Sequence, residues 1–155
     1  KVKNGDARDV QTRGLESRFH IYNESEANLL GVVFTDTGIM TAAPYEVVDA
    51  DHWLFSGTGM RNGDTFGQES LHERIPGGAS GHETDKTSPS SPPNVRVVAR
   101  GLNPDNGGAE ITYYDTPSGG AVFSAGSMTY PTSILVDDTV SRLTANAIKH
   151  FLEGP

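Results

Sequence analysis

The amino-acid sequence predicts an α/β domain, built from a small mixed sheet and a C-terminal helix that covers one face of that sheet. Short runs rich in β-branched and aromatic residues alternate with Gly, Pro, Asn and Asp, which is typical of strands joined by turns. Near the C-terminus the apolar residues change to a helical spacing. A strand that is followed by a covering helix is an α/β arrangement.

The composition fits one globular domain and excludes several classes of protein. The chain has 155 residues, of which 35% are hydrophobic, and its formal net charge is −8 at pH 7. Such an acidic chain lacks the basic patch that binds phosphates, so we expect neither a nucleic acid nor a membrane as partner. No apolar run approaches the roughly 18 residues that a bilayer requires. The absence of cysteine excludes disulfides, thiolate metal sites and cysteine nucleophiles, and it leaves the cellular compartment open.

We divide the chain into a polar lead-in segment, residues 1–28, and one domain over residues 29–155. Because the chain begins with Lys1 rather than Met, we expect it to be processed, a fragment or a piece of something longer. In the lead-in segment, Asn23 is placed to cap a short helix whose first turn carries acids. The apolar runs at 30–34, 45–49 and 51–55 predict short strands or extended segments.

Residues 56–94 form a long irregular stretch that contains many Gly, Ser and Pro residues. A flexible linker needs no large apolar side chains, but this stretch carries Met60, Phe66, Leu71 and Ile75 at spaced positions. We therefore predict an ordered loop whose apolar residues anchor it to the domain.

Residues 95–152 are the clearest unit. Strands are predicted at 95–99, 109–114 and 121–125, and the turn that ends in Gly119-Gly120 predicts an antiparallel hairpin between the last two. Asp137 and Asp138 then begin a helix that runs to about Leu152. The two acids suit the positive N-terminal end of this helix. The predicted apolar stripe of this helix consists of Val140, Leu143, Ala147, Ile148, Phe151 and Leu152.

The densest polar cluster is the segment 77–86, which we call the glycine-flanked arc. Within it His82, Glu83 and Asp85 offer acid–base groups or metal ligands. In an extended segment Glu83 and Asp85 would face the same side, and neighbouring carboxylates raise each other's pKa until one can donate a proton. The alternative is a solvated turn in which Asp85 caps the backbone and Lys86 pairs with Asp85.

Several well-defined catalytic and metal-binding motifs are only partly matched, because the spacing of their residues differs here. The His-Glu pairs that begin at His72 and His82 lack the second histidine of a zinc-protease motif, and the run Gly78–Gly81 is one residue short of a nucleophile elbow. The segment 103–108 is interpreted as a turn rather than a calcium loop. His52, beside Trp53, is either a core histidine bonded to the backbone or the wall of a pocket near the glycine-rich loop.

Two C-terminal segments resemble a known family. The run Gly-Gly-Ala-Val-Phe-Ser-Ala-Gly-Ser at 119–127 is followed by Val-Ser-Arg-Leu-Thr-Ala-Asn-Ala-Ile at 140–148 and by Phe151-Leu152. Together they look like the C-terminal end of the N,N-dimethylformamidase large (beta) subunit family. The Gly-His-Glu-Thr-Asp-Lys run at 81–86, residues 94–101 and residues 29–32 extend this resemblance over roughly residues 29–153.

The resemblance implies that this chain is the C-terminal piece of a much longer enzyme and is incomplete alone. It implies a class I glutamine-amidotransferase-like domain with three α/β/α layers, and a cytoplasmic location. The assembled enzyme would hydrolyse the C–N bond of a small amide with iron-activated water, and its other partner would be the remainder of the enzyme or a partner subunit. The family's mononuclear iron is held upstream of the matched region, so we expect no metal ligand in this chain.

The resemblance also implies roles for single residues. Glu83 resembles a glutamate of the family and would be the general acid or base. We expect His82 and Asp85 to adjust the pKa of Glu83, and Ser80, Gly81 and Ser127 to contact the substrate. Two other functions stay open. One is a structural or interaction module with a degenerate amidotransferase-like fold. The other is a sugar-processing or sugar-binding domain, because the chain's ending also resembles trehalose-utilisation-like proteins.

Overall fold

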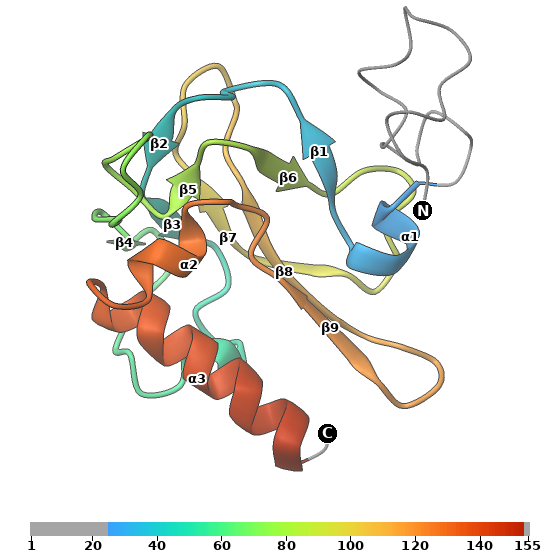
Figure 1. Ribbon diagram of the computed structural model, residues 1–155. Coiled ribbons are helices and arrows are strands. Elements are labelled where there is room, and N and C mark those ends of the chain that lie inside the picture. Colours follow the sequence, from blue (N-terminus) through green and yellow to red (C-terminus); the bar gives the residue numbers. More distant parts are fainter. Residues whose placement is uncertain (1–24, 154–155) are drawn as a thin grey trace, which may run out of the picture.

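The computed structural model describes residues 25–153 and places a five-stranded sheet at its centre, in the order β4-β3-β7-β8-β9 (Figure 1). The strands of this sheet are β3 (Tyr45–Val47), β4 (Thr65–Phe66), β7 (Arg96–Gly101), β8 (Glu110–Asp115) and β9 (Ala121–Ser124). Two smaller sheets pair β1 (Val33–Thr35) with β6 (Thr84–Lys86), and β2 (Ala42–Ala43) with β5 (Ser80–Gly81). The helices are α1 (Ala27–Leu30), the 3-10 helix η3 (Trp53–Phe55), α2 (Tyr130–Ser133) and α3 (Asp138–Glu153).

All the named strand pairs of residues 25–153 are antiparallel, so the prediction of a mixed sheet is wrong. A parallel neighbour needs a crossover of a dozen or more residues, which is usually a helix. Within the part of the chain that the structure describes, the long helix α3 follows the last strand and connects no two strands. The predicted hairpin is confirmed, because β8 pairs with β9 from Thr112 opposite Ser124 to Asp115 opposite Ala121.

Helix α3 covers one face of the large sheet, as predicted, but only part of its apolar stripe is buried (Figure 1). Val140, Leu143 and Ala147 lie in the core, and burial of a large apolar side chain stabilises a fold by about 1.5–3 kcal/mol. The last three members of the predicted stripe are exposed: Ile148 by 55%, Phe151 by 46% and Leu152 by 81%. In the last turns His150 takes the inward position instead, where its ring stacks on Trp53.

The opposite face of the sheet is covered by short strands, loops and the short helix α1 rather than by a long helix. The hydroxyl of Tyr114 donates to the carbonyl of Leu29 at 2.5 Å, and the Glu110 carboxylate accepts from the backbone N–H of Thr87 at 2.8 Å. Strand β8 is therefore buried on both faces, between α3 on one side and the α1, β1 and β6 segments on the other. Strand β6, the last part of the glycine-flanked arc, therefore lies among the segments that cover β8.

Three local predictions for the first half of the domain are corrected. The run at 51–55 forms η3 rather than a strand, because His52 caps it by accepting the N–H of Leu54 at 3.3 Å. The run at 30–34 is divided between the end of α1 and the start of β1. In the long loop Phe66 is buried as predicted, but Leu71 is 57% exposed, and the loop is held there by the Leu71 N–H, which donates to the carbonyl of Thr132 at 3.2 Å.

The proposed cap Asn23 lies outside the described residues, as does most of the lead-in segment. No helix in the described part of the chain combines the length and the apolar character that crossing a membrane requires.

Candidate functional site

The glycine-flanked arc folds as two short strands with a turn between them. Strand β5 ends at Gly81, His82 and Glu83 form the turn, and β6 begins at Thr84. His82 has a φ of 65°, which turns the chain out of β5. Glu83 lies in this turn and Asp85 lies within β6, so the two carboxylates do not belong to one extended segment. The arc runs beside the segment 126–128, because the N–H of Asp85 donates to the carbonyl of Gly126 at 2.7 Å.

The structure brings the three predicted substrate contacts together but uses their polar groups internally. The N–H of Gly81 donates to the Ser127 hydroxyl oxygen at 2.8 Å. Ser80 is fully buried, and its hydroxyl donates to the Asn103 side-chain oxygen at 2.7 Å while accepting the N–H of Ala109 at 2.9 Å. These bonds hold the arc against the rest of the fold.

Asn103 is the residue at this site that sequence reasoning missed. Its side-chain NH₂ donates to the Thr41 hydroxyl at 2.8 Å and to the Ser80 carbonyl at 3.0 Å. The predicted turn at 103–108 is present, with Gly107 N–H donating to the Pro104 carbonyl at 2.9 Å. An asparagine shortly after a strand is typical of a turn, but its amide can also both donate and accept in a buried position.

The two carboxylates of the arc have different surroundings. Glu83 is exposed, whereas Asp85 is partly buried. Burial, together with the negative charges of Glu26 and then Glu83, raises the pKa of Asp85 to about 6. The Lys86 ammonium group donates to the carbonyl of Asn106 at 2.6 Å, so it is engaged away from Asp85.

Asp85→Asn is expected to stabilise the protein above pH 6. The raised pKa means that ionisation of Asp85 opposes folding: its neutral form supports the fold below the unfolded value of 3.8, and this support is lost as pH rises through about 6. After allowance for the partial exposure of Asp85, the substitution is expected to raise the free energy of unfolding at pH 7.5 by about 1 kcal/mol. Urea unfolding at pH 4 and pH 7.5 measures it, with exposed Asp51→Asn as control. A gain of equal size at both pH values would contradict the assignment.

His82 has an unusual partner. Its Nδ1 atom is buried without a hydrogen-bond partner, and its ring centre lies 5.0 Å from that of His72. His72 Nδ1 in turn accepts the N–H of Ile75 at 3.1 Å. Residues 25–153 contain no group of three or more His, Asp or Glu side chains placed to hold a metal ion. The resemblance expects the iron ligands upstream of the matched region, and that expectation stays a prediction.

A second polar cluster joins the sheet to the end of α3. The Tyr113 hydroxyl donates to the Asp115 carboxylate at 2.6 Å, so it accepts from Nε2 of His150 at 2.9 Å. Burial and the neighbouring Asp115 raise the pKa of Tyr113, and burial followed by the positive charge of Arg96 lowers the pKa of His52. His52 accepts the backbone N–H of Leu54, as the first interpretation expects. It lines a cavity of about 250 Å³ that includes no residue of the glycine-flanked arc.

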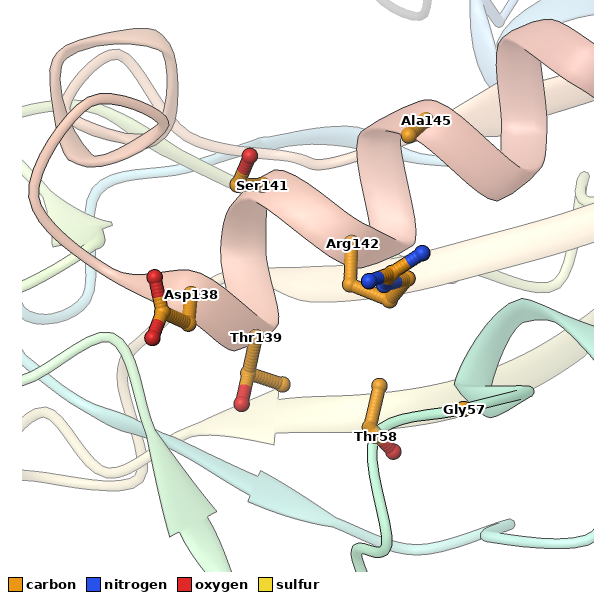
Figure 2. A pocket seen from close by; sticks show the side chains of 7 residues that line it. All are labelled: Gly57, Thr58, Asp138, Thr139, Ser141, Arg142 and Ala145. Atoms are coloured by element: carbon orange, nitrogen blue, oxygen red, sulfur yellow. The ribbon is translucent and has the colours of Figure 1, made fainter.

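A third feature is a hollow between the loop after η3 and the first turns of α3 (Figure 2). Its volume is about 620 Å³. The residues that line it are Gly57, Thr58, Asp138, Thr139, Ser141, Arg142 and Ala145. Sequence reasoning gave these residues no chemical role.

Comparison with known proteins places the chain in a family. Residues 3–141 match the family described as N,N-dimethylformamidase beta subunit-like, C-terminal. The chain belongs to this family. The family that the C-terminal motifs predict is therefore confirmed, and the match includes the whole glycine-flanked arc.

A curated relative of this dimethylformamidase-like chain is the N,N-dimethylformamidase beta subunit of Paracoccus aminophilus. The two are 32% identical over an alignment of 107 positions, and this alignment covers 51% of this chain and 14% of the relative. The chain thus matches a small part of a much longer subunit.

Proposed function

We propose that this chain is the C-terminal part of a dimethylformamidase-like amidohydrolase, which hydrolyses the C–N bond of a small amide when assembled with the remainder of the enzyme or a partner subunit. Membership of the family carries this proposal, supported by the relative that is named as a dimethylformamidase beta subunit. The matched residues are 14% of that relative, so the rest of such an enzyme would supply most of the catalytic machinery.

In this proposal Glu83 is the general acid or base. Its carboxylate lies exposed on the turn of the arc, where a docked segment of the enzyme would enclose it and a substrate amide would exchange a proton with it. Ser80, Gly81 and Ser127 act by holding that turn, because their polar groups are bonded within the chain. Asp85 and His82 adjust the electrostatic surroundings of Glu83.

Iron and the complete fold would come from outside the described residues. The iron implied for the family would be held by another part of the enzyme, since residues 25–153 offer no ligand group. An amidotransferase-like domain of three layers would include this antiparallel sheet as an edge portion, as happens in large mixed sheets.

Glu83→Gln in the assembled enzyme tests the role of the arc. We expect kcat for a small amide to fall about 100-fold or more, because a positioned acid or base contributes roughly 10²–10⁴-fold. The matched control is Glu153→Gln, which removes an exposed carboxylate at the far end of α3 and leaves turnover unchanged. Circular dichroism and assembly of each variant establish that only the proton transfer is affected.

A non-catalytic interaction module is the second candidate. The observation that favours it is the internal use of the polar groups on Ser80, Gly81 and Ser127 together with the exposure of Glu83. Turnover that is unchanged in Glu83→Gln, combined with assembly lost on deletion of this chain, would establish the module and remove the catalytic proposal.

A further inference from the structure

The hollow beside α3 is lined by a carboxylate, on Asp138, and a guanidinium group, on Arg142, that do not form an ion pair with each other. Asp138 and Arg142 are four residues apart on one helix, a spacing at which opposite charges commonly form an ion pair. The ion pairs found in the described part of the chain are Arg96–Asp49, Arg100–Glu110 and Lys149–Glu153. Figure 2 shows the Asp138 carboxylate and the Arg142 guanidinium extending in different directions along the same wall. Both charges are therefore available to a ligand.

The opposite wall of the hollow is held in place. The hydroxyl of Thr58 donates to the carbonyl of Phe55 at 2.7 Å and accepts the N–H of Met60 at 3.2 Å. One turn beyond Arg142, the Asn146 side chain donates to the carbonyls of Leu54 and Ser56 at 2.8 and 2.9 Å, which ties the loop to α3. The gap of about 620 Å³ is thus preformed, and its size is typical of small-molecule sites.

The charges of the lining select the ligand. An isolated anion that approaches Arg142 is repelled by Asp138, and an isolated cation that approaches Asp138 is repelled by Arg142. The other lining residues are neutral, and Thr139 and Ser141 add hydroxyl groups. A molecule with a carboxylate at one end and an ammonium at the other satisfies both charges at once.

We propose that this hollow binds a small zwitterion of the amino-carboxylate class. The carboxylate accepts forked hydrogen bonds from the Arg142 guanidinium, and the ammonium group donates to Asp138. The site is formed entirely by this chain, on the first turns of α3 and the loop after η3. It is independent of Glu83 and of amide hydrolysis.

Titration of the full 155-residue chain with three matched probes tests this site. The probes are 6-aminohexanoate, hexanoate and hexylammonium. Their binding in low salt is measured by the changes in the amide chemical shifts of Thr58 and Thr139. We expect the zwitterion to shift both signals and to bind at least about fivefold more tightly than either singly charged probe, as expected for one exposed charge contact.

Variants separate the proposal from simpler explanations. Arg142→Gln and Asp138→Asn are each expected to weaken 6-aminohexanoate at least about fivefold, while Lys149→Gln, an exposed cation further along α3, changes nothing. Hexanoate binding as tightly as the zwitterion, and more tightly to Asp138→Asn, would show a plain anion site and overturn the proposal. Absence of any shift at saturating probe would also overturn it.

Discussion

Gly78→Ala is expected to destabilise the protein by about 3 kcal/mol or more, as a substitution that forces backbone atoms apart does. A Cβ atom at this position would lie 2.3 Å from the carbonyl oxygen of Ala43 and 2.7 Å from its nitrogen. Those atoms belong to β2, which pairs with β5 at the start of the arc, so no side chain can rotate away to make room. Thermal or urea unfolding of the whole chain measures the loss.

The neighbouring Gly77→Ala is the matched control. Gly77 has a φ of 106°, but nothing lies within 4 Å of its added Cβ. Its substitution therefore introduces only backbone strain, of about 1–3 kcal/mol. A loss at Gly78 no larger than that at Gly77 would show that β2 does not press against the arc as described.

Asn103→Ala is expected to cost about 3–5 kcal/mol, because it leaves several buried groups without partners. The side chain is only 6% exposed and bonds to the Thr41 hydroxyl, the Ser80 hydroxyl and the Ser80 carbonyl. Removing it also frees the Ser80 hydroxyl that accepts the N–H of Ala109. Urea unfolding provides the free energy, and amide hydrogen exchange at Ala109 shows whether the network opens locally.

The control for this network is Asn94→Ala. Asn94 is exposed, and its side chain donates a single hydrogen bond, to the carbonyl of Asp115 at 2.8 Å. Water replaces that bond when the side chain is removed, so the cost stays below about 1 kcal/mol. Equal losses for the two asparagines would mean that the Asn103 amide is not part of a buried network.

Local sequence patterns predicted the elements whose partners are close in the chain. The β8–β9 hairpin followed from a Gly-Gly turn between two apolar runs, and α3 followed from acids before a helical stripe. The antiparallel direction of the strands could not be predicted from local patterns, because the pairing of β3 with β7 joins segments about fifty residues apart. The run at 51–55 also misled, since one side-chain cap from His52 outweighs the strand preference of its neighbours.

For the candidate site, the sequence predicted which residues share the arc but not how their side chains are used. The alternation rule for Glu83 and Asp85 requires both residues to lie in one strand, but Glu83 lies in the turn that follows the left-handed backbone at His82, and β6 begins only at Thr84. Asn103 comes from a turn some twenty residues away, so only the folded chain places it beside Ser80. The hollow that contains Asp138 and Arg142 did not follow from the sequence, because it depends on where the loop after η3 lies against α3.

The order of pairing in the central sheet has a consequence for how the molecule folds. Strands β7, β8 and β9 are neighbours in both sequence and space, so this meander can form through short loop closures. The arc, in contrast, gains its bonds to Asn103 and Ser127 only after the meander and the C-terminal segment are in place. We therefore expect the arc to be acquired late and to open first in native-state hydrogen exchange, while β8 stays protected until the whole domain unfolds.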